Sequence, residues 1–183
     1  MPHLGRGVEI PPAAPRQDDL PMTRTVALES LTPDAFAPFG DVLAATGDFR
    51  LINEGLCHRH HDRARLDFGP EGRAGISIFD AVPRALPYAF TLVERHPEGS
   101  QAFVPMHAHP FLVIVAPDEG DRPGRPRAFV TDGTQAINFH RGTWHGVLTP
   151  LSAPGLFAVI DRIGTTANLQ EYSFDTPWVV TDR

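Results

Sequence analysis

Two separated segments of the chain carry imidazole and carboxylate groups at spacings that suit chemistry. Glu94 and His96 are two residues apart, so on an extended strand both side chains point to the same side. His140 and His145 flank Gly142, and a glycine at positive φ permits a sharp reversal that directs both imidazoles toward one point. Neutral imidazole and carboxylate bind divalent transition metals, and they also transfer protons near neutral pH without a metal. Glu94, His96, His140 and His145 are therefore the catalytic candidates, with both kinds of chemistry open.

Two other residues accompany these clusters. Gln101 follows a turn rich in proline and glycine, and a hairpin there would return its side chain to the face of Glu94. Trp144 stands beside the second pair of histidines, although a tryptophan in such a place is more often a core residue than a ligand contact. We expect both to contact a substrate. For Glu94 and His96 alone, a surface pair beside a turn is an equally good interpretation.

The basic residues limit the chemistry further. The chain contains no lysine, so all 16 basic residues are arginine, and a lysine Schiff base is excluded. A substrate carboxylate would have to be held by arginine or by a metal. The candidates are Arg59, in a dense polar run that follows Asn53, and Arg162, at the end of a predicted strand. A solvated loop for Arg59 and an ion pair of Asp161 with Arg162 are equally compatible alternatives.

A third histidine pair, His107 and His109, has the spacing that places two imidazoles on one side of a strand. Its surroundings do not resemble a strand, because Pro105 precedes it and Pro110 follows it. We interpret this segment as an exposed turn.

The elements that must position these residues are short strands. Turn residues separate them at spacings of about 8 to 12 residues, without the alternating helices of a parallel sheet, which predicts an all-β sandwich or barrel. One short helix is expected from Asp34 to Phe39, with Thr32 as its cap, Pro33 at its first position and Gly40 after its end. The expected strands are Ala74–Phe79, Ala89–Glu94, Ser100–Pro105, Phe111–Ala116, Arg127–Thr131, Gln135–Phe139, Trp144–Leu148 and Leu156–Arg162.

Length and composition favour one domain in a reducing compartment. The 183 residues suffice for one well-buried domain, and residues 1–22 are so rich in proline that we predict a flexible arm. A net charge of -6 without a basic stripe argues against a nucleic-acid partner. The single cysteine, Cys57, excludes an intrachain disulfide and a thiolate-rich zinc site. No apolar run reaches the ~20 residues that span a bilayer, and residues 1–22 lack a secretion signal, so we expect a cytoplasmic protein without membrane contact.

Five stretches of the sequence together span nearly everything after Thr25. They are FAPFGDVL (36–43), INEGLCHRHHD (52–62), LVERHPEGSQAFVPM (92–106), NFHRGTWH (138–145) and IDR (160–162). These stretches resemble the ureidoglycolate lyase family. The resemblance implies a cupin-like double-stranded β-helix, or jelly-roll barrel, with residues 23–183 as a single catalytic domain.

The family resemblance also suggests ligands and an assembly. Glu94 and His96 stand where general cupins have two histidines, Gln101 stands near the usual glutamate, and His145 matches the histidine of the second cupin motif. These four residues would hold a divalent metal, nickel by analogy with the family, and no organic cofactor is implied. His140 replaces a proline of the second motif. The family suggests a homodimer.

The activity implied by the resemblance is cleavage of (S)-ureidoglycolate into glyoxylate and urea, a step of allantoin and purine degradation. The elimination needs a base for the hydroxyl proton and an acid for the departing nitrogen. The expected substrate contacts are Asn53, Arg59, Gln101, Trp144 and Arg162. Two alternatives stay open: a metal-dependent cupin oxygenase or isomerase, and a non-catalytic cupin that binds a small carboxylate.

Overall fold

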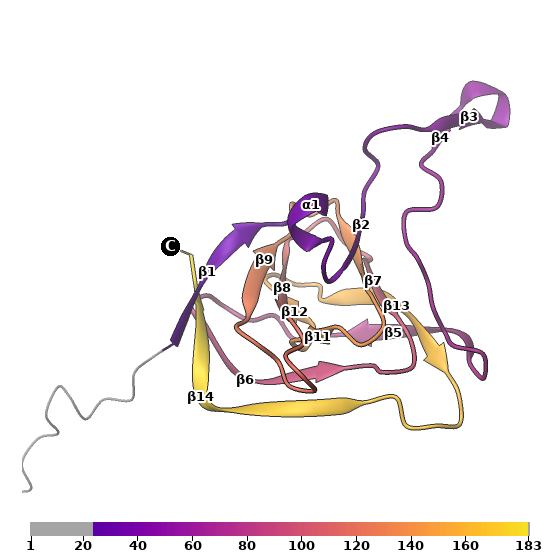
Figure 1. Ribbon diagram of the computed structural model, residues 1–183. Coiled ribbons are helices and arrows are strands. Elements are labelled where there is room, and N and C mark those ends of the chain that lie inside the picture. Colours follow the sequence, from indigo (N-terminus) through magenta and orange to yellow (C-terminus); the bar gives the residue numbers. More distant parts are fainter. Residues whose placement is uncertain (1–23, 183) are drawn as a thin grey trace, which may run out of the picture.

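Nearly all regular structure in the computed structural model, which describes residues 24–182, is β-strand (Figure 1). The only α-helix in this range is α1 (Pro33–Phe36), and one 3₁₀ turn, η2, covers Asn53–Gly55. The strands are β1 (Arg24–Ser30), β2 (Gly40–Leu43), β3 (Arg50–Ile52), β4 (Cys57–Arg59), β5 (Arg73–Asp80), β6 (Tyr88–Arg95), β7 (Gln101–Pro105), β8 (Phe111–Ala116), β9 (Arg127–Val130), β10 (Ala136–Phe139), β11 (Trp144–His145), β12 (Thr149–Pro150), β13 (Leu156–Ile163) and β14 (Gln170–Thr181).

The strands form a closed barrel and a second sheet. The larger sheet has the order β11-β6-β14-β1-β9-β8-β12, and β11 also pairs with β8, which closes six strands into a ring. The second sheet has the order β2-β10-β7-β13-β5, and β3 pairs only with β4. This architecture confirms the predicted all-β, cupin-like fold.

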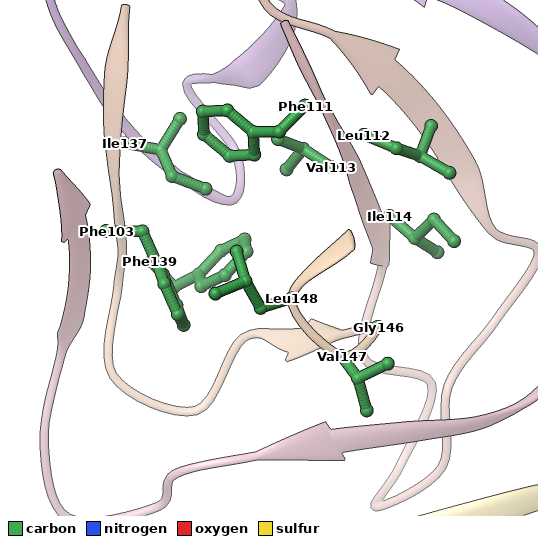
Figure 2. A pocket seen from close by; sticks show the side chains of 10 residues that line it. All are labelled: Phe103, Phe111, Leu112, Val113, Ile114, Ile137, Phe139, Gly146, Val147 and Leu148. Atoms are coloured by element: carbon green, nitrogen blue, oxygen red, sulfur yellow. The ribbon is translucent and has the colours of Figure 1, made fainter. Parts of the chain in front are cut away.

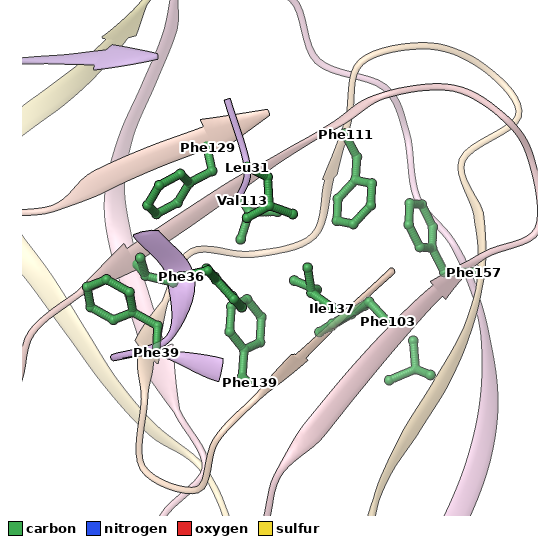
Figure 3. Close-up of a cluster of buried hydrophobic side chains, with 12 residues drawn as sticks. Leu31, Phe36, Phe39, Phe103, Phe111, Val113, Phe129, Ile137, Phe139 and Phe157 are labelled. Atoms are coloured by element: carbon green, nitrogen blue, oxygen red, sulfur yellow. The ribbon is translucent and has the colours of Figure 1, made fainter. Parts of the chain in front are cut away.

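Phenylalanine side chains fill the space between the two sheets (Figure 3). Strand β8 is buried along its whole length because its alternate residues face two different clusters. Phe111, Val113 and Val115 face the phenylalanine cluster, whereas the residues between them pack in a second cluster around Trp144. These two cores hold the strands that carry the candidate site.

Helix α1 is shorter than predicted. The Thr32 hydroxyl accepts a hydrogen bond from the amide of Ala35, and Pro33 occupies the start of the helix, as expected. The helix ends at Phe36, three residues before the predicted end, because Pro38 has no amide hydrogen with which to continue it. The Phe36 ring is fully buried against Phe129, so the helix anchors the barrel wall.

The sequence prediction omitted six strands, β1, β2, β3, β4, β12 and β14, and extended a seventh, β11, too far. Strand β14 escaped it because Pro177 lies inside the strand, where a register shift separates the pairing of Ser173 from that of Trp178. The expected strand Trp144–Leu148 is wrong after its second residue: β11 ends at His145, and the backbone amide of Gly146 donates instead to the Ile114 carbonyl. The predicted arm, residues 1–22, lies outside the described part of the chain.

Strands β3 and β4 form a hairpin that stands out from the barrel (Figure 1). We call residues 48–63 the projecting arm. Its tip has three consecutive residues with positive φ, Asn53, Glu54 and Gly55. Among the described residues, no helix is long and apolar enough to cross a membrane.

Candidate active site

Three of the predicted catalytic residues meet at the seam where the barrel closes. Glu94 is near the end of β6 and His96 directly follows that strand, while His145 on β11 is the cross-strand partner of Glu94. One ligand atom from each lies within 4.8 Å of the others, and within residues 24–182 this is the only such group of three. Strand alternation brings Glu94 and His96 together as predicted, with 4.0 Å between Oε1 and Nε2.

Backbone carbonyls determine which nitrogen of each histidine is free. His96 Nδ1 lies 2.7 Å from the Asn168 carbonyl oxygen, and His145 Nδ1 lies 3.0 Å from that of Gly146. Because a carbonyl only accepts hydrogen bonds, Nδ1 is the protonated nitrogen in both rings and Nε2 keeps its lone pair. Both Nε2 atoms are buried without a partner among the described residues. Two unpaired imidazole nitrogens beside a carboxylate fit a divalent transition metal. The two backbone carbonyls hold the opposite ring nitrogens, which is the usual way in which a metal-binding histidine is oriented.

Burial sets the charge state of the cluster. It lowers the pKa of His145 to about 3, so this imidazole is neutral at physiological pH. Burial also raises the pKa of Glu94, and the neighbouring Glu171 carboxylate raises it further, against the opposing effect of His96. His145 is thus suited to donate a lone pair and unsuited to store a proton, while Glu94 is a stronger base than an exposed glutamate.

An aromatic wall supports the cluster on one side. The ring of Phe139, at the end of β10, stacks on His145 with centroids 4.2 Å apart and an interplanar angle of 5°. The cross-strand partner of Phe139 on β7 is Gln101, whose buried Oε1 has no hydrogen-bond partner among the described residues. The predicted hairpin between β6 and β7 is wrong, because these strands belong to different sheets.

His140 lies in a separate polar cluster. Its Nε2 is 3.0 Å from Asp41 Oδ1 and 3.5 Å from the guanidinium of Arg65. Burial alone would raise the pKa of Asp41, but hydrogen bonds from the Arg65 amide, Asn138 and His140 lower it below its usual value. The sequence interpretation missed Asp41, which lies far from His140 in the chain. The one available signal was its position inside the family stretch FAPFGDVL.

Cavities adjoin His140. One of about 380 Å³ is lined by Arg65, Asp67 and His140, and another of about 440 Å³ includes His140 and Trp144. A hydrogen bond joins the turn that carries His140 to the cluster of Glu94, His96 and His145. The amide of Gly142 donates to the carbonyl of His96 over 2.9 Å. Gly142 has φ +78°, the positive value that the sequence predicted.

Trp144 is a packing residue. It is buried in the second core cluster, and its indole Nε1 donates to Asp118 over 3.1 Å. The guanidinium of Arg95 lies 4.5 Å from the centre of its ring and is itself paired with Asp118 and Asp121. These contacts position β11 beside β6.

Arg162 is buried, and the carboxylate of Glu98 balances its charge. Its Nη2 lies 3.2 Å from Glu98, and its Nε donates to the Phe68 carbonyl. A cavity of about 210 Å³ includes Arg162, Glu98 and Arg141 in its lining. The buried Nη1 has no partner among the described residues. The structure thus places Arg162 in an ion pair that fixes the 98–99 turn.

The remaining two predicted contacts, Arg59 and Asn53, are on the projecting arm. Figure 1 shows this arm well away from β6 and β11 of the same chain. His107 and His109 lie in a turn, as predicted, but the predicted exposure is wrong: both are half-buried, and the His107 ring packs against Phe157. The His109 amide donates to His107 Nδ1, and the two rings stack. Neither residue belongs to the cluster of Glu94, His96 and His145.

One gap between the strands is too small for a substrate. Ten residues, all apolar or glycine, surround about 10 Å³, which is at the lower limit for a single water molecule (Figure 2). Phe139 of this lining stacks on His145 and Gly146 follows it, so apolar packing lies on one side of the polar cluster.

A closed β-barrel with a half-buried cluster of two histidines and one carboxylate defines a cupin-like enzyme. The family model described as ureidoglycolate lyase matches residues 23–181. The ureidoglycolate lyase of Rhodobacter capsulatus is 59% identical, over 84% of this chain and 96% of its own length. Ureidoglycolate lyase 1 of Rhizobium meliloti is 47% identical over 88% and 96%, respectively. The chain belongs to the ureidoglycolate lyase family, which confirms the resemblance noted in its sequence.

Proposed function

We propose that this protein cleaves (S)-ureidoglycolate into glyoxylate and urea at the cluster of Glu94, His96 and His145. The observation that carries the proposal is the meeting of these three donors within 4.8 Å in a chain of the ureidoglycolate lyase family. The substrate is a small hydroxy acid, which suits a compact polar cluster of two imidazoles and one carboxylate.

The reaction requires two proton transfers in opposite directions. The substrate hydroxyl loses its proton, its O–H electrons form the aldehyde C=O bond, and the C–N bond breaks with its electrons on the ureido nitrogen. That nitrogen must gain a proton, because a urea anion is a poor leaving group. We assign the base to a carboxylate oxygen of Glu94, whose raised pKa favours acceptance of the proton.

The acid in this scheme is the imidazole of His140. With Nε2 donating to Asp41, the Nδ1 of the protonated ring is left to donate to the departing nitrogen. The hydrogen bond from Gly142 to the His96 carbonyl supports this assignment, since it ties the His140 turn to the other half of the site. Asp41 is a positioning residue for His140.

The donor set also supports a divalent metal held by His96, His145 and one oxygen of Glu94, with Gln101 Oε1 as a fourth candidate ligand. A metal there would act as a Lewis acid and would lower the pKa of the substrate hydroxyl. Imidazole nitrogens suit nickel as well as zinc, iron and copper, and the family resemblance favours nickel. The two buried Nε2 atoms bind nothing else among the described residues, which agrees with a ligand role.

A metal-dependent oxygenase is the second candidate. Two histidines and one carboxylate are also the ligands of non-haem iron oxygenases, so the donor set alone does not separate the two reactions. Family membership favours the lyase. The two functions differ in a simple measurement, because an oxygenase consumes O₂ and the lyase consumes none.

A coupled assay of glyoxylate and urea, with racemic ureidoglycolate as substrate, tests the proposal. We expect equal amounts of both products, a halt at half of the racemate, and no O₂ uptake. Chelation should abolish turnover, and added Ni²⁺ should restore it. Product from a Glu94→Gln variant at the wild-type rate, or no urea from the wild type, would contradict the assignment.

We further propose that the protein acts as a homodimer in the cytoplasm. The edge strand β5 supports the dimer, since Ile76 and Ile78 on its outer face are 75% and 59% exposed. Light scattering measures the assembly directly. The single cysteine agrees with a reducing compartment.

A further inference from the structure

The projecting arm lacks a core of its own. Its two short strands pair only with each other, and an isolated two-stranded hairpin is marginally stable in water. Two large apolar side chains flank the tip of the arm and are exposed: Leu51 is 60% exposed and Leu56 is 87% exposed. The contacts that shape the arm are local, such as the stacking of Phe49 on His58 and the hydrogen bonds of Arg63 to the Asp48 carbonyl and to the Thr46 carbonyl at the base of the arm. An apolar tip of this kind needs a surface to cover it.

The tip is also held in an unusual backbone conformation. Asn53 and Glu54 have φ of 52° and 59°, a region that costs a residue other than glycine about 1 to 3 kcal/mol. Strained residues of this kind cluster at sites that contact ligands or partners. Leu56, which directly follows the strained turn, is 87% exposed, and Figure 1 shows no other part of the same chain around the far end of the arm.

The arm also carries an arginine whose side chain has no partner among the described residues. Arg95 and Arg162 are paired with acidic residues, Arg141 donates to the Pro97 carbonyl, and the guanidinium of Arg65 lies 3.5 Å from His140 Nε2. Arg59 is exposed; its backbone pairs with β3, but its side chain makes no hydrogen bond or ion pair with any residue from 24 to 182. It lines a cavity of about 280 Å³ together with Arg50 and other residues of the arm.

We infer that two copies of the chain exchange their projecting arms, so that Arg59 of one copy binds the substrate carboxylate at the Glu94 cluster of the other. This inference rests on the proposed lyase function. A second copy is the occupant because each chain has both complementary parts: an arm with an unpaired arginine and an apolar tip, and, elsewhere on its surface, the acidic pair Glu94 and Glu171 and the exposed apolar edge strand β5. In a dimer with a two-fold axis, each arm contacts the other subunit in the same way, so both arms are covered at once. Each site is then incomplete in a monomer.

Mixed dimers test whether Arg59 acts across the subunit boundary. Arg59→Ala and Glu94→Gln variants, with different tags, are co-expressed so that the subunits pair at random, and glyoxylate release is measured at low substrate concentration. Each variant alone should be nearly inactive under these conditions. Arg59→Ala should raise KM about 10- to 100-fold, because the substrate carboxylate loses its two hydrogen bonds to the guanidinium, and Glu94→Gln should lose the base. Half of the mixed population is heterodimer, and each heterodimer has one intact site. The mixture should therefore recover about 25% of wild-type activity.

The control pair is Arg84→Ala with Glu94→Gln, because the side chain of the surface residue Arg84 bonds only the nearby Val82 carbonyl among residues 24–182. This mixture should retain about half of the wild-type activity, and purification on both tags in succession verifies that heterodimers have formed. If the Arg59 and Glu94 mixture stays at parental activity while the control reaches half, Arg59 acts within its own chain and the inference is wrong. A monomeric wild type, or a fully active Arg59→Ala variant, overturns it equally. Failure of the lyase function appears separately, as a wild type that releases no glyoxylate.

Discussion

The buried imidazole of His145 gives the metal-free protein a specific sensitivity to acid. In the folded chain its pKa is about 3, compared with 6.5 for an ordinary histidine, because burial disfavours the charged ring. Between these two values the unfolded chain binds a proton that the native chain does not. Stability is therefore fully retained above about pH 6.5 and is lost progressively as the pH falls toward 3.

The size of the effect follows from the shift. At pH 4.5 the unfolded histidine is about 2 pH units below its pKa while the native ring is still neutral, and each unit is worth about 1.36 kcal/mol. His145 should thus cost the native state about 3 kcal/mol at pH 4.5 relative to pH 7.5. A domain of this kind has about 5 to 15 kcal/mol in total, so the loss is large.

Urea unfolding of wild type and His145→Asn at both pH values measures this term. Asparagine retains a donor for the Gly146 carbonyl and does not titrate. A chelator is present throughout, because metal binding has its own proton linkage. The other groups, including Glu94, titrate in both proteins, so the difference between them isolates His145. If wild type and variant lose equal free energy between pH 7.5 and 4.5, the ring titrates normally and the burial argument fails.

Three further substitutions separate chemistry from structure. Glu94→Gln should lower kcat at least 100-fold and reduce bound metal measured by mass spectrometry, while the melting temperature stays within a few degrees. Arg162→Ala should cost about 1 to 3 kcal/mol in urea unfolding, because it removes a buried guanidinium that bonds the Phe68 carbonyl and Glu98; a stable variant with only a raised KM would instead make Arg162 a substrate contact. Glu29→Gln should cost less than about 1 kcal/mol, since its ion pair with Arg127 is half exposed, and a larger loss in the same assay would contradict this.

The pairing of Glu94 with His96 was predictable because it depends only on strand alternation, which any β assignment supplies. The barrel itself was predictable from strand lengths and the family stretches. The partner of His140 was not, since Asp41 comes from β2 and reaches β10 only when the second sheet forms. Contacts between strands far apart in sequence leave no local periodicity.

The projecting arm shows a different limit. Its polar sequence predicted a loop, and a strand pair appears there only because Asn53 to Gly55 adopt positive φ and reverse the chain. The sequence placed Arg59 and Asn53 with the substrate, whereas the fold of one chain holds them away from it. A prediction made from one sequence does not include contacts between two copies of the chain. Residues that act between chains are therefore easily assigned to the wrong neighbours.

Strand β11 links the site to the stability of the barrel. It has only two residues, yet it pairs with both β6 and β8 and so closes the ring of six strands. One of these residues, Trp144, is fixed by packing and by Asp118, and the other, His145, presents its unpaired Nε2 to the candidate metal position. A ligand held jointly by His145 on β11 and Glu94 on β6 would bridge the same seam that the backbone closes. Binding at the site and closure of the barrel are therefore coupled, since a ligand that favours the paired strands stabilises the native state by the free energy of its binding.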